Sequence, residues 1–203
     1  MNVSHPFRAL FPALDGVVLS VLARTTRPRT GREIARIAER SPAGVRSVLE
    51  RLVEQGLVDR ERAGNAFVYT LNRDHLAAPA VEDLVDLRGK LLERLRRRIG
   101  DWSIAPVHSS LFGSAARGDG DEGSDIDLFV VRPGDVDEDD PTWRAQLDGL
   151  AEGVRRWTGN HAGIVELSTK QLASLKRRRP PVLRELDADA VTLSGPEVGT
   201  ILR

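Results

Sequence analysis

Hydrophobic residues in the first third of the chain recur three times at the spacing of an amphipathic helix, over 15–24, 30–38 and 41–54. The second and third of these segments open with favoured helix starts, a capping box of Thr30 with Glu33 and an N-cap of Ser41 before Pro42. The pattern then changes to strand-like segments on either side of an Ala-Gly-Asn turn, at 57–62 and 66–71. The first third of the chain therefore predicts three helices followed by a hairpin.

The rest of the chain alternates between helical and strand-like patterns. Residues 75–100 keep a helical rhythm of apolar positions, which predicts one long helix. An apolar run that ends at Phe112 predicts a strand that turns into a short helix. The helices and strands expected after it cover 128–131, 142–157, 162–168, 170–179 and 191–193. These patterns predict an α+β protein.

The order of three helices and a hairpin is that of a winged helix-turn-helix domain. The segment from Val48 to Val58, followed by a strand that contains Tyr69, resembles many bacterial winged-helix regulators. We therefore expect a winged helix-turn-helix domain over 1–74, a connecting helix over 75–100 and a second domain over 101–203.

Two interpretations of the N-terminal domain stay open. If it binds duplex DNA, its third helix enters the major groove with Arg46 and Ser47, and Arg60 and Arg62 on the wing reach the DNA backbone. Winged helices also serve as modules for protein interaction and dimerisation, so a protein partner or a homodimer is the alternative.

The amino-acid composition excludes several kinds of site and indicates where the protein acts. The 203 residues contain no cysteine, which excludes disulfides and thiolate metal sites. No apolar run reaches the length of a membrane span, and residues 1–6 lack the charged region and apolar core of an export signal, so we expect a cytoplasmic protein without membrane contact. The net charge is zero, but residues 1–74 carry twelve arginines against eight acids, whereas 119–140 holds ten acids and one arginine. This asymmetry indicates different partners for the two regions.

Most of the candidate metal-binding and phosphate-binding residues lie between Leu111 and Val131. Asp125 and Asp127 alternate along a predicted strand, so their side chains project to one face about 7 Å apart. Paired carboxylates are suitable ligands for Mg²⁺ or Mn²⁺ in phosphoryl transfer. Upstream, Gly113 and Ser114 form a turn whose backbone N–H groups suit the phosphates of a nucleoside triphosphate.

Across Gly113 to Leu128 the sequence resembles the nucleotidyltransferase superfamily related to DNA polymerase β, and especially its small bacterial minimal members. The shared pattern is a Gly-Ser turn, Ala-Arg-Gly, and Ser-Asp-Ile-Asp-Leu. The resemblance implies a mixed sheet flanked by helices, and a nucleotide site made by Gly113, Ser114, Arg117 and Ser124. Arg117 either touches phosphate or caps the loop.

The resemblance also implies a third carboxylate on a neighbouring strand. Together with Asp125 and Asp127 it would complete the catalytic metal site and activate the acceptor hydroxyl. Glu166 occupies that place in the sequence, although many minimal members carry aspartate there. A run of basic residues over 176–179 offers an RNA or triphosphate contact, with solvated charge as the alternative.

Three functions follow from these resemblances. The first is a Mg²⁺-dependent nucleotidyltransferase that moves a nucleoside monophosphate from a nucleoside triphosphate to a hydroxyl of a protein, an RNA or a small molecule. The second is a DNA-binding transcription regulator whose nucleotidyltransferase fold senses nucleotide or dimerises. The third is an antitoxin-type partner of a toxin. The sequence identifies neither the nucleobase nor the acceptor nor the DNA operator.

Overall fold

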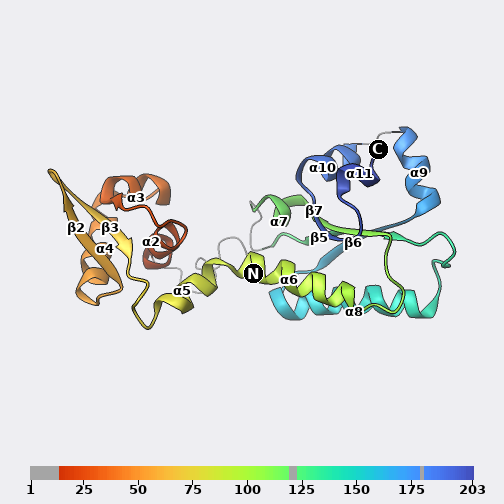
Figure 1. Cartoon of the computed structure of the whole chain (residues 1–203), viewed down its shortest axis with the longest axis horizontal. Coiled ribbons are helices and arrows are strands. Elements are labelled where there is room, and N and C mark those ends of the chain that lie inside the picture. Colours follow the sequence, from red (N-terminus) through yellow and green to blue (C-terminus); the bar gives the residue numbers. More distant parts are fainter. Residues whose placement is uncertain (1–13, 119–122, 179–180) are drawn as a thin grey trace. The chain divides into compact units, whose positions relative to one another are not determined.

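The computed structural model describes residues 14–118, 123–178 and 181–203, which form two compact units that divide between Leu87 and Arg88 (Figure 1). Each unit has its own cluster of buried hydrophobic residues. Within the described ranges, no helix is long and apolar enough to cross a membrane. The expected loop over 118–123 and the basic run over 176–179 lie partly outside the described residues.

The N-terminal unit begins with three helices, α2 (Leu14–Ala23), α3 (Gly31–Ala38) and α4 (Pro42–Glu54). The predicted helix starts are confirmed. Thr30 and Glu33 form a complete capping box at α3, and the Ser41 side chain accepts a hydrogen bond from the Gly44 backbone N–H at the start of α4. The inward residues of the three helices then build one core, which includes Val18, Leu22, Ile34, Val45, Leu49 and Leu52.

The wing of this unit is an antiparallel hairpin of β2 (Val58–Ala63) and β3 (Ala66–Leu71), joined on the β3 side by the two-residue strand β1 (Arg29–Thr30). Val58 and Leu71 at the base of the hairpin are buried in the core, whereas residues 59–67 are exposed. The hairpin is therefore anchored at its base and open to solvent along the rest of its length.

The segment over 75–100 differs from the prediction. It forms two helices, α5 (Ala78–Val85) and α6 (Leu87–Gly100), which are separated at Asp86. Ala78 and Val81 of α5 are buried in the N-terminal core, whereas the inward residues of α6 are buried in the C-terminal core: Leu91, Leu92, Leu95 and Ile99. Each half therefore buries its apolar stripe in a different core.

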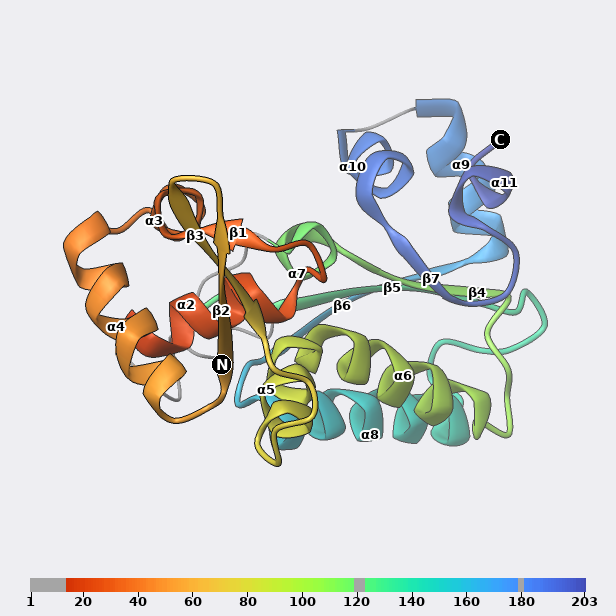
Figure 2. The ribbon, with the colours of Figure 1, turned by 60° about the vertical axis from the view of Figure 1, so that its left-hand side comes forward.

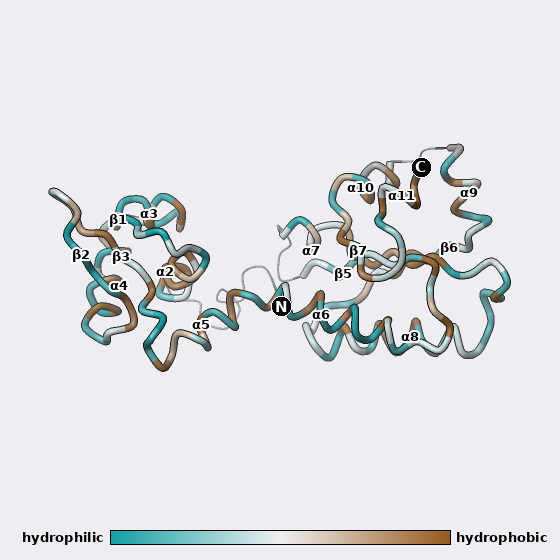
Figure 3. Tube along the Cα trace, viewed as in Figure 1, coloured by the Kyte–Doolittle hydropathy of each residue, from teal (hydrophilic) through white to brown (hydrophobic). Residues whose placement is uncertain are grey.

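The C-terminal unit contains a four-stranded sheet in the order β6-β5-β4-β7. These strands are β4 (His108–Phe112), β5 (Ile126–Arg132), β6 (Ala162–Ser168) and β7 (Val191–Ser194). β5 and β6 run parallel, while the other pairs are antiparallel, so the predicted mixed sheet is confirmed. In Figure 3 the hydrophobic residues follow these central strands.

Helices cover both faces of this sheet (Figure 2). On one face lie α6 and α8 (Pro141–Thr158), whose inward side chains pack against Ile126, Leu128 and Val130. On the other face lie α9 (Thr169–Arg178), α10 (Pro181–Asp189) and α11 (Val198–Ile201). Their core includes Phe129 and Val131 of β5. Alternate residues of β5 thus belong to alternate cores.

Candidate functional site

Asp127 is the second residue of β5 and lies on the sheet face of Phe129 and Val131. Its register partners are Phe112 at the end of β4 and Gly163 near the start of β6. The Asp127 side chain is partly buried. Asp125 lies one residue before β5 and is exposed. The two acids therefore stand at one end of the two central strands, one at the surface and one partly enclosed.

The turn between α8 and β6 fixes the segment that carries these acids. Asn160, which is buried, donates a side-chain hydrogen bond to the carbonyl of Ser124 over 2.7 Å. The backbone N–H of Ile126 donates to the carbonyl of His161 over 2.9 Å. Asp125 is thus held between two residues whose backbones are hydrogen-bonded to the same turn.

The environment of Asp127 disfavours its charge. Burial of the carboxyl raises its pKa, and the neighbouring Asp125 carboxylate raises it further, while the positive charge of Arg117 acts in the opposite direction. A cation bound between the two carboxylates would relieve this repulsion. A carboxyl with a raised pKa beside a second carboxylate is typical of a functional site.

Gly113 begins α7 (Gly113–Arg117), the short helix that follows β4. Its backbone has a φ of 67°, which favours glycine, and a Cβ atom at this position would overlap the Oδ2 atom of Asp127. Any larger residue would therefore strain the turn and displace the carboxylate. Ser114, partly buried, follows at the same turn, so the predicted turn and the predicted acid lie side by side.

Two arginines flank α7. The Arg88 Nε atom of α6 donates to the carbonyl of Ala115 over 3.0 Å, and its Nη2 atom donates to the carbonyl of Ala116. Arg117, at the end of α7, forms an ion pair with Asp189 of α10 at 3.5 Å. Arg88 therefore satisfies carbonyls at the end of α7, and Arg117 both pairs with an acid and contributes positive charge near Asp127.

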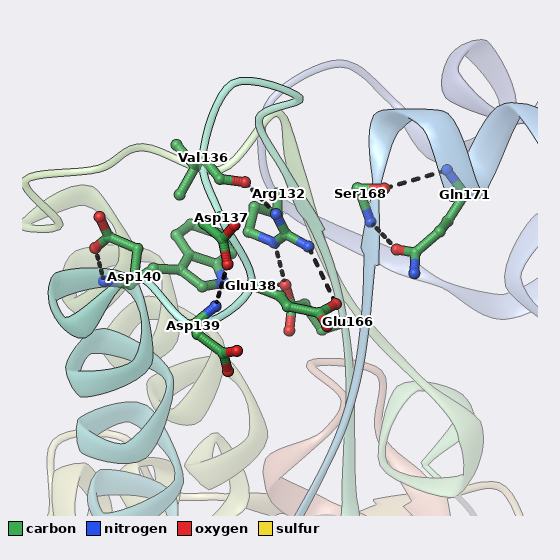
Figure 4. Close-up of polar contacts among 10 residues, drawn as sticks. Arg132, Val136, Asp137, Glu138, Asp139, Asp140, Glu166, Ser168 and Gln171 are labelled. Atoms are coloured by element: carbon green, nitrogen blue, oxygen red, sulfur yellow. Dashed lines mark hydrogen bonds and ion pairs between the residues drawn. The ribbon is translucent and has the colours of Figure 1, made fainter.

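The structure does not bring Glu166 together with Asp125 and Asp127. Glu166 is the register partner of Val130, whose side chain lies on the face of the sheet opposite to that of Asp127. There the Oε1 atom of Glu166 lies 2.6 Å from Arg132 Nε (Figure 4). The same oxygen accepts a hydrogen bond from Trp143 Nε1 over 3.0 Å.

The contacts of Arg132 explain where Glu166 lies. The Arg132 side chain is only 8% exposed, so it needs a nearby carboxylate and further acceptors. Besides Glu166 it contacts the carbonyl of Val136 and the carboxylate of Glu138 (Figure 4). Glu166 thus joins β5, β6 and α8 as the partner of a buried arginine.

The residues predicted to contact DNA lie on two elements of the N-terminal unit. Arg46 and Ser47 are exposed on α4, and Arg60 and Arg62 are exposed on β2. The Arg60 guanidinium carbon lies 4.9 Å from the ring centre of Phe67. All four predicted side chains are therefore accessible to a partner.

Two family models match the chain. The model of the nucleotidyltransferase domain matches residues 89–179, and the model of the MarR family matches residues 12–66. The chain carries a MarR-type winged helix-turn-helix domain and a nucleotidyltransferase domain. Both resemblances drawn from the sequence are confirmed at this level.

Some solved structures are similar to parts of this chain, at low sequence identity. A structure of Lactococcus lactis ZitR in complex with DNA is 25% identical, with a TM-score of 0.32, over 44% of this chain and 60% of that chain. A toxin-antitoxin structure with AMP-PNP is 17% identical, with a TM-score of 0.38, over 55% of this chain and 80% of that chain. The chain thus spans about three-fifths of the ZitR chains that it matches. No curated protein matches the chain.

Asp125 and Asp127 supply the type of ligand that a divalent cation would need at this site. Carboxylate oxygens are ligands that Mg²⁺ and Mn²⁺ favour, and the repulsion between these two acids would be relieved by a cation. In the part of the chain that the structure describes, no group of three metal-binding side chains occurs. The third carboxylate implied by the resemblance is thus not supplied by Glu166.

Two residues that contact the candidate site were not predicted from the sequence. Asn160 holds the Ser124 carbonyl, and no sequence pattern links these two distant residues. Gly163 lies opposite Asp127, and here a signal existed, because a glycine inside a strand often marks a close approach of another group. The glycine inside this strand pattern could therefore have indicated that another group approaches the strand at position 163.

Proposed function

We propose that the nucleotidyltransferase domain transfers a nucleoside monophosphate from a nucleoside triphosphate to a hydroxyl of a protein, an RNA or a small molecule, with Mg²⁺ or Mn²⁺. The observation that carries this proposal is the placement of Asp127 beside Asp125 and against the Gly113 turn. This placement brings the suggested cation ligands next to the suggested phosphate-binding turn.

In this proposal Asp125 and Asp127 hold the cation, which would neutralise charge on the triphosphate and on the departing pyrophosphate. Gly113, Ser114 and Ser124 would place their backbone or hydroxyl groups near the phosphates, and Arg117 would add positive charge. The acceptor oxygen forms a bond to the α-phosphorus, the bond from that phosphorus to the β-phosphate oxygen breaks, and pyrophosphate leaves. Glu166 lies on the other face of the sheet, so the acceptor proton would pass to water rather than to that carboxylate.

A second candidate function is supported by the position of Glu166. With that carboxylate paired to Arg132, the domain would bind nucleotide and cation without rapid transfer, and nucleotide would regulate a DNA-binding protein. The MarR-type domain would then bind duplex DNA through Arg46 and Ser47 of α4 and through the wing. In either case we propose that the protein acts in the cytoplasm, where nucleoside triphosphates and DNA are both present.

Transfer is tested with each α-labelled nucleoside triphosphate, Mg²⁺ or Mn²⁺, and a host lysate. We expect the wild-type protein to label a discrete acceptor and Asp127→Asn to lose on the order of 100-fold or more in rate, because charge neutralisation dominates phosphoryl transfer. Asp148→Asn, which removes an exposed acid of α8, serves as the matched control and should label at the wild-type rate.

The outcomes of this experiment distinguish the proposed transferase from the proposed regulator. Labelling by Asp127→Asn at the wild-type rate would contradict the proposed site. Metal-dependent nucleotide binding without any labelled acceptor would favour the regulator, and a nucleotide-dependent change in duplex affinity would then support it. Equal losses in Asp127→Asn and Asp148→Asn would show that the labelling does not depend on the site.

A further inference from the structure

The carboxylate of Asp127 lies between two glycines that come from different elements. Gly113 at the β4–α7 junction faces its Oδ2 atom, and Gly163 of β6 faces its Oδ1 atom. A Cβ atom built on Gly163 would lie 2.8 Å from Oδ1, closer than real Cβ atoms approach other atoms. We call the space between these two glycines the Asp127 slot.

The backbone conformation of β6 does not require a glycine at position 163. Within the described residues, the glycines with positive φ are Gly56, Gly64, Gly113, Gly118, Gly159 and Gly195, so Gly163 has backbone angles that other residues adopt. A glycine inside a strand weakens it, because it loses more conformational freedom and contributes no side chain to packing. The strand itself would therefore favour a larger residue at this position.

The surroundings of Gly163 do give a reason. Apart from its chain neighbours, the atoms that lie within 4 Å of a Cβ built at this position are Oδ1 and Cγ of Asp127. On the same face of β6, Val165 and Leu167 carry full side chains opposite Phe129 and Val131. Gly163 therefore leaves its space to the carboxylate of Asp127 and to no other described group.

We propose that Gly163 is a positioning residue of the nucleotide site, which holds the Asp127 carboxylate in the orientation that binds the divalent cation. This inference rests on the proposed function. A side chain at 163 would push Oδ1 away from β6 and so turn or shift the carboxylate. Because metal–ligand distances must be correct within about 0.2 Å, a shift of a few tenths of an ångström is enough to weaken binding.

The proposal is tested by Mn²⁺ binding to the full-length protein, measured by electron paramagnetic resonance with and without nucleoside triphosphate. We expect Gly163→Ala to bind Mn²⁺ about tenfold or more weakly than wild type. Gly100→Ala, at the end of α6, where a Cβ meets no atom within 4 Å, should bind as wild type does.

A thermal double-mutant cycle separates positioning from a structural defect. In the Asp127→Ala background the slot is empty, so Gly163→Ala should raise the melting temperature, as expected for removing a strand glycine. With Asp127 present, the same change should give a smaller rise or a fall. A change of equal size in both backgrounds, whether a rise or a fall, would overturn the inference, since Gly163 would then act independently of Asp127.

The failure of this inference differs from the failure of the proposed function. If the wild-type protein binds Mn²⁺ and Gly163→Ala binds it equally well, the positioning role is overturned and the metal site stands. If the wild-type protein binds neither Mn²⁺ nor a metal–nucleotide complex, the proposed function is overturned, and the positioning role falls with it.

Discussion

His108 is fully buried on β4, but only one of its ring nitrogens has a hydrogen-bond partner among the described residues. Nδ1 lies 2.8 Å from the carbonyl of Pro196, so it carries the hydrogen of the neutral ring, and Nε2 is without a partner. Burial lowers the pKa of His108, against the opposing effects of the Pro196 carbonyl and the Glu197 carboxylate. The folded protein therefore keeps this histidine neutral where an exposed histidine would take up a proton.

This residue predicts a pH dependence of stability. Because its pKa is lower in the folded than in the unfolded chain, the unfolded chain binds the extra proton as pH falls below about 6.5, and stability is lost through that window. We expect the contribution to have a slope of at most about 1.4 kcal/mol per pH unit. Urea unfolding from pH 5 to pH 8 measures it, and His108→Gln should flatten the slope. An unchanged slope in that variant would contradict the assignment.

At the scale of one element, the exposed wing has two faces of opposite charge. Strand alternation and register place Arg60 and Arg62 on the face of Phe67, while Asp59 and Glu61 point to the other face. Arginine beside an exposed aromatic ring suits the phosphates, sugars and bases of nucleic acid. The hairpin therefore presents one face that suits DNA and one that repels it.

We expect the double variant Arg60→Ala/Arg62→Ala to bind duplex DNA about tenfold or more weakly at 0.1 M salt. The slope of log affinity against log salt should fall by about 2, because each arginine that neutralises a phosphate releases about one counterion. The matched control is Asp59→Asn/Glu61→Gln on the opposite face, which should leave the slope unchanged. Equal effects of both double variants would indicate general charge rather than a specific face.

At the scale of the whole molecule, and among the described residues, the hydrophobic core of the N-terminal unit is separate from the two clusters that lie on the two faces of the C-terminal sheet. Leu49 of α4 is fully buried in the N-terminal core, and Leu150 of α8 is fully buried in the C-terminal core. The boundary between Leu87 and Arg88 falls inside a helical region, where α5 packs with one core and α6 with the other. Each unit therefore has the buried surface that a cooperative folding unit requires.

We expect two thermal transitions in differential scanning calorimetry. Leu49→Ala and Leu150→Ala should each destabilise one unit by about 2–5 kcal/mol, through the lost transfer energy and the cavity left behind. Each variant should lower the midpoint of one transition by roughly 10 °C or more and leave the other in place. A single transition that both variants shift equally would show that the two units unfold as one.

The helix caps and the candidate site motif could be predicted from the sequence, because the residues that form them are close together in the chain. Thr30 and Glu33 cap a helix that begins beside them, and Ser41 with Pro42 starts the next. The Gly113 turn and the Asp125–Asp127 pair likewise lie close together in the chain, between β4 and the start of β5, so the motif that they form together indicated a common site. Helical and strand periods identified most of the long elements, because those periods reflect burial on one side.

Short elements and the helical break were decided by tertiary contacts. The two-residue β1 exists through its pairing with β3, and it has no period of its own. The helical rhythm over 75–100 continues through Asp86, so it did not reveal that α5 and α6 serve different cores.

The position of Glu166 depended on the register between β5 and β6, which the sequence did not specify. Side chains alternate along a strand, so a difference of one residue in register moves every side chain to the other face. The structure pairs Asp127 with Gly163 and Val130 with Glu166, which puts a glycine beside the aspartate and the glutamate beside Arg132. The types of element and the local motif could be predicted because they depend on residues that are neighbours in the chain. The residue that meets Asp127 could not be predicted, because strand register is set by the packing of the whole domain.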